Sequence, residues 1–127
     1  MPSLDHTIVH ARDAKASADF FAEVLGLEAP RRFHIFWIVD TDNGVSLDFI
    51  ETDEPYLEEH YAFLVTEAEF DEIFGRIEER GLDYWADPAA RRPGEINRND
   101  GGRGVYFRDP AGHYLEIITR RYGSGDG

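Results

Sequence analysis

Two acidic side chains stand in strand-forming segments whose neighbours are largely apolar. Glu116 interrupts the β-favouring run from Leu115 to Thr119, and Asp48 interrupts the run from Val45 to Ile50. A carboxylate is costly to bury in such a place unless a partner pairs with it or a cation binds it. Because the chain contains no cysteine, any metal site has to be built from histidine and carboxylate ligands.

The first half of the chain is expected to form a strand, a helix and two further strands. Asp13 is a favourable N-cap, and Gly26 is placed to end a helix after Leu25. Asp42-Asn43-Gly44 has the composition of a tight hairpin turn. The expected elements are a strand at 4–10 that is buried on both faces, a helix at 13–25, a strand at 33–39 and a returning strand at 45–50.

The second half repeats this order. Thr66-Glu67-Ala68-Glu69 is a capping box that begins a helix, and Gly81 is placed to end it. Asp109-Pro110-Ala111-Gly112 has the residue order of a type I turn. The expected elements are strands at 60–65 and 82–85, a long surface loop at 88–102, and two strands on either side of the turn, at 105–107 and 115–119.

The two halves therefore predict an α+β fold of two βαβββ modules in one domain. Module one covers about 1–52, module two about 59–122, and 123–127 is expected to be a flexible tail. A pseudo-twofold between like modules would bring equivalent side chains toward one point. Strand alternation allows this for the four residues that combine the right chemistry, which are His6, Asp48, His60 and Glu116.

The composition and charge of the chain disfavour some kinds of binding partner. With 127 residues, 42% hydrophobic and 13% aromatic, the chain is large enough for one folded domain with a core. Its formal net charge of −13 disfavours nucleic acid or an anionic membrane as a partner. No apolar run approaches the roughly 20 residues needed to cross a bilayer. We therefore expect a cytoplasmic protein that acts on a small molecule.

Three motifs carry a resemblance that covers nearly the whole chain: Asp5-His6, Glu59-His60 and the run from Phe107 to Ile117. With them the chain resembles the vicinal oxygen chelate superfamily, which includes glyoxalase I, extradiol dioxygenases, and the fosfomycin- and bleomycin-resistance proteins. The resemblance implies a cupped mixed sheet that holds a divalent metal, and usually a homodimer. The implied metal ligands are His6, His60 and Glu116, with Asp48 at the position of the fourth, acidic ligand of glyoxalase I.

Such a ligand set suits Fe(II), Mn(II), Ni(II), Co(II) or Zn(II) and leaves coordination positions open for a substrate. The metal then acts as a Lewis acid that takes two neighbouring substrate oxygens and stabilises an enolate-like anion. Asp48 and Glu116 are the candidate catalytic carboxylates. Because Asp is one methylene shorter than Glu, Asp48 either ligates directly, binds through water or acts as a base. The alternative interpretation is that both acids face solvent and the histidines are ordinary strand residues.

Three further residues are candidates for substrate contact. Tyr106 is the strongest, because it lies on the strand beside the one that carries Glu116, and Trp37 is another aromatic strand residue. Arg103 follows the long loop and is a candidate partner for an anionic substrate. Aromatic strand residues that pack in the core, and a loop cation that balances local acids, are the alternatives. His113 is interpreted as a turn or packing residue and not as a ligand.

Three functions remain open from the sequence. The first is a metal-dependent enzyme of the glyoxalase/dioxygenase type, acting as a lyase, isomerase or dioxygenase on a small oxygen-rich molecule. The second is a metal-free binding or sequestering protein of the bleomycin-resistance type. The third is a thiol transferase of the fosfomycin-resistance type. The joint presence of His6, His60 and Glu116 argues against the second.

Overall fold

The computed structural model describes residues 1–125 and divides the chain into two compact units. The first, here called module 1, comprises residues 1–57 together with 109–111. The second, module 2, comprises residues 58–108 and the chain from Gly112 onward. Each module contains one helix and one four-stranded sheet, so the α+β fold with two βαβββ modules is confirmed.

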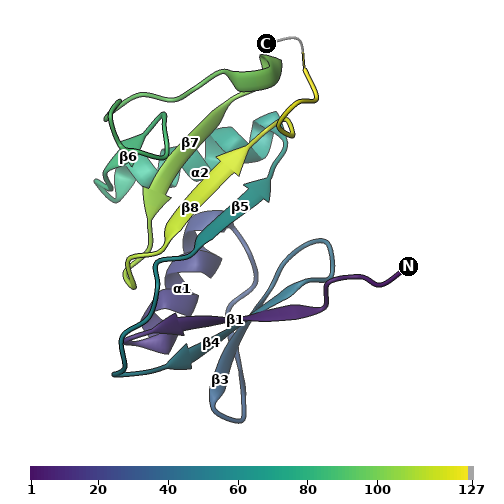
Figure 1. Ribbon diagram of the computed structural model, residues 1–127, viewed down its shortest axis with the longest axis vertical. Helices are drawn as coiled ribbons and strands as arrows, with labels where there is room; N and C mark the ends of the chain where they lie inside the picture. The colour runs from purple at the N-terminus through teal and green to yellow at the C-terminus, as the bar shows by residue number, and fades with distance from the viewer. Residues whose placement is uncertain (126–127) are drawn as a thin grey trace. The chain divides into compact units, whose positions relative to one another are not determined.

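The sheet of module 1 has the strand order β1-β4-β3-β2 (Figure 1). Its strands β1 and β4 are parallel, and the remaining neighbours are antiparallel. The elements of this module are β1 (His6–Ala11), α1 (Ala14–Leu25), β2 (Arg31–Phe33), β3 (Phe36–Asp40) and β4 (Ser46–Glu51).

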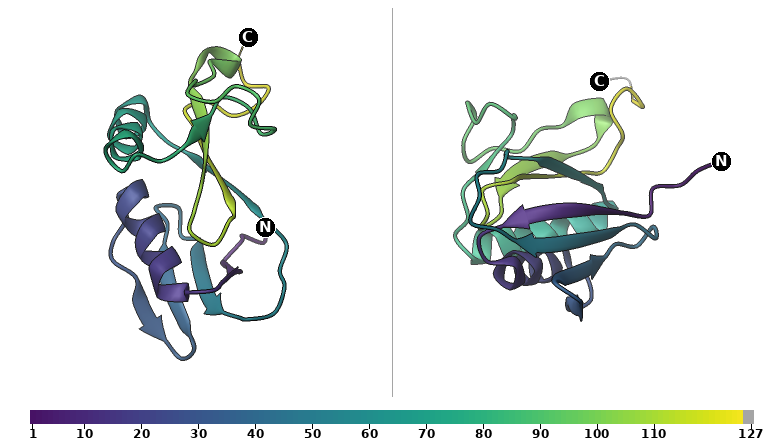
Figure 2. Two further views of the ribbon diagram at one scale, coloured as in Figure 1. Left: turned by 90° about the vertical axis from the view of Figure 1, so that its left-hand side faces the viewer. Right: turned by 60° about the horizontal axis from the view of Figure 1, so that its bottom comes forward.

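The helix α1 begins and ends as its sequence predicts. The Asp13 side chain accepts a hydrogen bond from the Ala16 backbone N–H at 3.0 Å, which satisfies one of the free donors of the first turn. Gly26 ends the helix at a φ of 73°, a left-handed conformation that favours glycine. The apolar side of α1 packs on the sheet, where the Phe21 ring meets Phe49 of β4 edge to face at 4.9 Å. In Figure 2, α1 lies against one face of its sheet.

The sheet of module 2 repeats that order as β5-β8-β7-β6, again with its first pair, β5 and β8, parallel. The elements of this module are β5 (His60–Leu64), α2 (Glu67–Glu79), β6 (Tyr84–Trp85), the 3₁₀ helix η1 (Asn99–Gly101), β7 (Gly104–Arg108) and β8 (Tyr114–Ile118). Both hydrogen bonds of the predicted capping box form between Thr66 and Glu69. Figure 1 shows α2 behind the strands of this sheet, and its residues Phe70, Ile73 and Ile77 are buried.

Two expectations for module 1 were wrong. The segment 33–39 is not one strand, because β2 and β3 form a hairpin whose turn passes through His34 at a φ of 52°. Glycine, asparagine or aspartate would mark such a turn, and histidine enters the left-handed region without that signal. The strand β1 is not buried on both faces, since Val9 is fully buried whereas Ile8 is 44% exposed.

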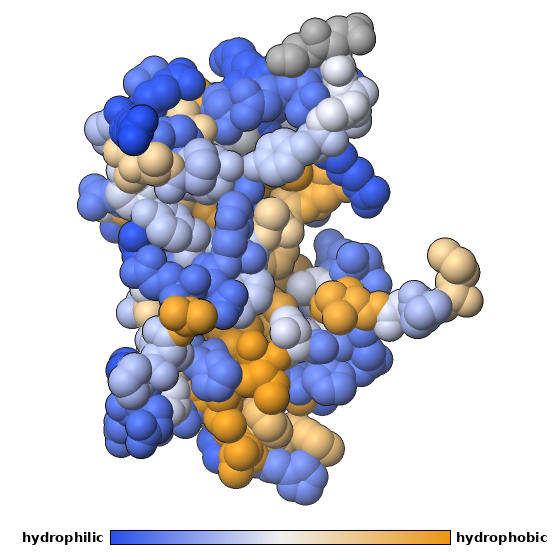
Figure 3. Space-filling view, in the orientation of Figure 1, coloured by the Kyte–Doolittle hydropathy of each residue, from blue (hydrophilic) through white to orange (hydrophobic). Residues whose placement is uncertain are grey.

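Each sheet therefore has a face covered by its own helix and an opposite face, which we call the open face. In β1 the open face carries His6, Ile8 and His10, and in β5 it carries His60, Ala62 and Leu64; all six are exposed. Figure 3 shows apolar side chains interrupting the hydrophilic surface where β1, β4 and β3 lie. Among the described residues, no helix is both long and apolar enough to cross a membrane.

The capping box predicts a measurable contribution to stability. Replacing Thr66 with alanine removes the side-chain acceptor of the Glu69 N–H. We expect the free energy of unfolding to fall by about 1 kcal/mol, measured by urea denaturation. Ser3→Ala, at an exposed position outside any element, is the control. Equal stability of the two variants would show that the cap does not hold the helix.

Candidate metal centre

The centre of the module 2 sheet brings the open-face side chains of three strands into register. Glu116 of β8 lies opposite Ala62 of β5 on one side and Tyr106 of β7 on the other. The adjacent residues Leu115 and Ile117 are fully buried. Alternation along β8 thus places the Glu116 carboxylate on the open face, although its own strand is otherwise apolar.

The Glu116 carboxylate is fully buried, and both of its oxygens are engaged. Its Oε1 lies 2.9 Å from Nε2 of His60, and its Oε2 accepts a hydrogen bond from the hydroxyl of Tyr122. The side chain of His60 is 48% exposed. This imidazole therefore contacts the buried carboxylate on one side and solvent on the other. An imidazole nitrogen and a carboxylate oxygen at this separation are two donors of the kind that divalent transition metals prefer.

Two tyrosine hydroxyls extend this arrangement. The hydroxyls of Tyr106 and Tyr122 are 2.9 Å apart. Burial, followed by the hydrogen bond to Glu116, raises the pKa of Tyr122 well above its ordinary value, and burial likewise raises the pKa of Tyr106. Both phenols therefore keep their protons at neutral pH. Since the single proton of Tyr122 goes to Glu116, Tyr106 donates to the Tyr122 oxygen.

Module 1 places a second carboxylate at the corresponding position of its sheet. Asp48 of β4 lies opposite Ile8 of β1 and Ile38 of β3. Its Oδ1 is buried and has no hydrogen-bond partner among the described residues. A buried carboxylate oxygen without a partner is costly, and a cation or a proton donor from a ligand would satisfy it.

His6 lies near Asp48 at the start of β1. Its Nδ1 is 2.7 Å from Oδ2 of Asp5. This hydrogen bond, and then the negative charge of Asp48, raise the pKa of His6. With Nδ1 held by Asp5, Nε2 is the nitrogen that remains for a ligand, an arrangement common among metal-binding histidines.

The structure thus brings the predicted ligands together in pairs. Glu116 and His60 are in contact within module 2, and Asp48 and His6 are electrostatically coupled within module 1. Across residues 1–125, no group of three His, Asp or Glu side chains is gathered closely enough to hold a metal ion. The meeting of all four residues around one ion therefore stays a prediction.

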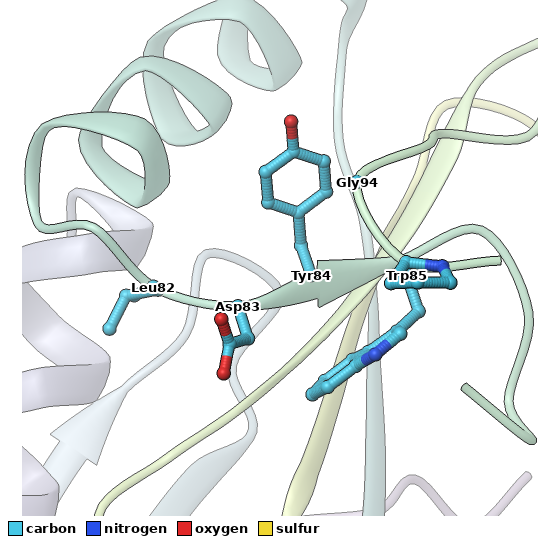
Figure 4. Close-up of a pocket in the computed structure, with 6 residues that line it drawn as sticks. Leu82, Asp83, Tyr84, Trp85 and Gly94 are labelled. Carbon is cyan, nitrogen blue, oxygen red and sulfur yellow. The ribbon is translucent and has the colours of Figure 1, made fainter. Parts of the chain in front are cut away.

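A hollow of about 360 Å³ lies at the edge of the module 2 sheet, on β6, and its lining does not include Glu116 or His60 (Figure 4). Tyr84 and Trp85 of β6 extend to opposite sides of the strand there. Asp83 is the one carboxylate among the six lining residues, which are Leu82, Asp83, Tyr84, Trp85, Pro93 and Gly94. One acid and no histidine give this hollow no set of metal donors.

Comparison with known proteins places the chain in a family. The family model described as the Glyoxalase/Bleomycin resistance protein/Dioxygenase superfamily matches residues 3–117. The chain belongs to this superfamily. The solved structure named oxidase ChaP-H1 is 64% identical, with a TM-score of 0.95 over 97% of this chain and 99% of the other. Oxidase ChaP-H2 is 60% identical, with a TM-score of 0.95 over 98% of each chain.

Among curated proteins, the chain is 31% identical to the glutathione transferase FosA of Serratia marcescens over 123 residues. That match covers 92% of this chain and 80% of the relative. The superfamily therefore contains relatives of this chain that are named for two different kinds of reaction.

The other two predicted substrate residues, Trp37 and Arg103, have contacts within their own modules. Trp37 of β3 is in register with Phe49, the neighbour of Asp48, and its ring lies under the cations of Lys15 and Arg32. Arg103 is paired with two carboxylates of α2, at 2.7 Å from Glu67 and 2.9 Å from Asp71. Within module 2, Tyr106 is in register with Glu116 and in contact with Tyr122, whereas Arg103 is engaged by α2.

The sequence did not predict the contact of Tyr122 with Glu116, but it did predict that His113 is a packing residue. Tyr122 follows β8 in a segment with no periodic pattern, immediately before the expected tail, so nothing local marks it as a partner of Glu116. His113 is fully buried and accepts the Glu59 N–H at Nδ1, which is the predicted packing role.

The partnerless oxygen of Asp48 makes a stability prediction. We expect Asp48→Val to leave the metal-free protein as stable as the wild type or more stable by about 1 kcal/mol, because it removes a buried carboxylate oxygen that has no hydrogen-bond partner among the described residues. Urea denaturation measures the change, and Asp53→Val, in an exposed loop, is the control. A loss larger than about 1 kcal/mol would mean that Asp48 already has a stabilising partner.

Proposed function

We propose that this chain is a metal-dependent oxidase that binds a small molecule through two neighbouring oxygens. The observation that carries the proposal is the buried Glu116 carboxylate with its Oε1 against Nε2 of the half-exposed His60. Oxidation as the type of reaction is supported by two solved structures, 64% and 60% identical to this chain, that are named oxidases. Dioxygen is the oxidant we propose.

The proposed ligands are His60 and Glu116 of module 2 with His6 of module 1, and Asp48 is the fourth acidic group. The donor set fits a divalent cation, because it combines imidazole nitrogens with carboxylate oxygens and Asp48 has an unsatisfied buried oxygen. The ligands come either from one chain or from two chains of a homodimer. Homodimer formation is part of this proposal.

When bound, a metal such as Fe(II) or Mn(II) supplies Lewis acidity and a path for electrons between the substrate and dioxygen. The protein's own residues would bind the metal, accept a proton and contact the substrate. Oε2 of Glu116 already accepts a hydrogen bond from Tyr122 and Oε1 lies beside Nε2 of His60, so Glu116 would serve as a metal ligand through Oε1 and not as a base. Asp48 has a free oxygen and is the better candidate to accept a proton from a substrate hydroxyl. Tyr106, whose ring meets His60 edge to face at 5.7 Å, would line the substrate side.

Thiol transfer is the second candidate, since the FosA relative is named a glutathione transferase. Its identity to this chain is 31%, against 64% for the oxidase ChaP-H1. The higher identity over nearly the whole of both chains favours oxidation.

Metal binding is the first test. We expect about one divalent ion per chain, and we expect His60→Ala to lower metal affinity at least about 10-fold because a ligand nitrogen is lost. Isothermal titration with Mn(II) measures the affinity. His34→Asn is the matched control, because it removes an exposed histidine while asparagine tolerates the left-handed turn. Equal affinities in His60→Ala and wild type would remove His60 from the site.

Oxidation is the second test. The Fe(II)-loaded protein is mixed with a panel of catechols and α-hydroxyketones, which present two neighbouring oxygens, and dioxygen uptake is followed with an oxygen electrode. We expect uptake with the wild type that His60→Ala lowers at least about 100-fold. In parallel, glutathione consumption is followed with fosfomycin as acceptor. Glutathione consumption without dioxygen uptake would favour the second candidate.

A further inference from the structure

The segment that follows β8 brings a side chain onto the Glu116 carboxylate. Tyr122 lies beyond the end of β8 at Ile118, yet its hydroxyl donates to Oε2 of Glu116. We infer that Tyr122 is a positioning residue, which occupies one oxygen of Glu116 so that the other is presented to the metal. This inference rests on the proposed function.

The two oxygens of Glu116 differ in what they face. Oε1 lies 2.9 Å from Nε2 of His60, so two atoms that can bind a metal are already adjacent on the open face. Oε2 instead accepts a hydrogen bond from the Tyr122 hydroxyl. A carboxylate held in this way binds a metal through one oxygen, which leaves a further coordination position for a substrate oxygen.

The position of Tyr122 is not explained by core packing. Its side chain is 57% exposed, whereas Glu116, which it contacts, is fully buried. Aromatic residues that stabilise a fold usually bury most of their ring. Here the hydroxyl contact is the specific interaction, and the ring stays largely in solvent.

A separate clamp holds the segment in place. Oδ1 of Asp100 accepts the backbone N–H of Gly123 at 3.0 Å and that of Gly125 at 3.4 Å. Asp100 itself has a φ of 57°, and a Cβ on Gly125 would collide with the Asp100 backbone. The clamp lies on η1, which is remote in sequence from the strand that carries Glu116.

Tyr106 completes the arrangement. Because the Tyr122 hydroxyl donates its hydrogen bond to Glu116, its oxygen is free to accept one, and the Tyr106 hydroxyl lies 2.9 Å from it. Tyr106 is in register with Glu116 on the neighbouring strand β7. The Tyr122 hydroxyl is therefore fixed from two sides, by an acceptor on β8 and a donor on β7.

The test compares Tyr122→Phe with Tyr56→Phe. Both remove one phenol hydroxyl, but the Tyr56 hydroxyl donates to the Ala111 carbonyl at 2.7 Å, whereas that of Tyr122 donates to Glu116. We expect Tyr122→Phe to weaken Co(II) binding about 10-fold or more and to change the visible spectrum of the bound Co(II), because the freed carboxylate alters the coordination. The control should change neither. Titration calorimetry and absorption spectroscopy measure the two quantities.

The clamp supplies a second variant. Asp100→Gly removes the carboxylate, and glycine adopts the left-handed φ without strain. We expect it to weaken Co(II) binding in the same direction, and the double variant with Tyr122→Phe to be no weaker than Tyr122→Phe alone. Additive losses would mean that Asp100 does not act through Tyr122.

The outcomes separate this inference from the proposed function. If the wild type binds no divalent metal, the proposed function and the inference both fail. If the wild type binds Co(II) and Tyr122→Phe binds it equally well or more tightly, the inference alone fails. A weaker Tyr122→Phe with an unchanged Co(II) spectrum would assign Tyr122 a structural role and would also overturn the inference.

Discussion

A buried carboxylate constrains the arrangement of module 2 more than any other group. Glu116 is fully buried on β8, one of the two central strands of its sheet, and a carboxylate is costly there unless its oxygens have partners. His60 and Tyr122 are those partners, and Tyr106 fixes the second of them. An apolar residue would be simpler to accommodate at this position. We propose a chemical reason for an acid at this position, which is that it offers a metal-binding oxygen beside an imidazole nitrogen.

The duplication of the βαβββ unit explains why a comparable acid occurs in each module. Asp48 and Glu116 both lie on the strand that pairs in parallel with the first strand of the module and antiparallel with the third. The two positions have diverged in their surroundings. Glu116 is flanked by Tyr106 and is hydrogen-bonded, whereas Asp48 lies between two isoleucines and keeps an unpartnered oxygen. This difference is the basis for proposing Glu116 as a metal ligand and Asp48 as a proton acceptor.

The sequence predicts what local chemistry determines. The Asp13 cap, the Thr66 capping box and the turns after β3 and β7 are set by residues within a few positions, and all were predicted. The turn at His34 was missed because its residues do not favour it, and its position is fixed by the pairing of β2 with β3. Tyr122 was missed for a related reason. Its partner lies on another element, and the segment that carries it is held by Asp100 through contacts with no local pattern.

We propose that ligands from both modules hold one metal ion. A crystal structure of the protein with Mn(II), with anomalous scattering used to locate the ion, tests it most directly. The account predicts one ion per site with Nε2 of His6, Nε2 of His60 and a single oxygen of Glu116 within about 2.0–2.3 Å of it. An ion bound elsewhere, or one bound without His6, would contradict it.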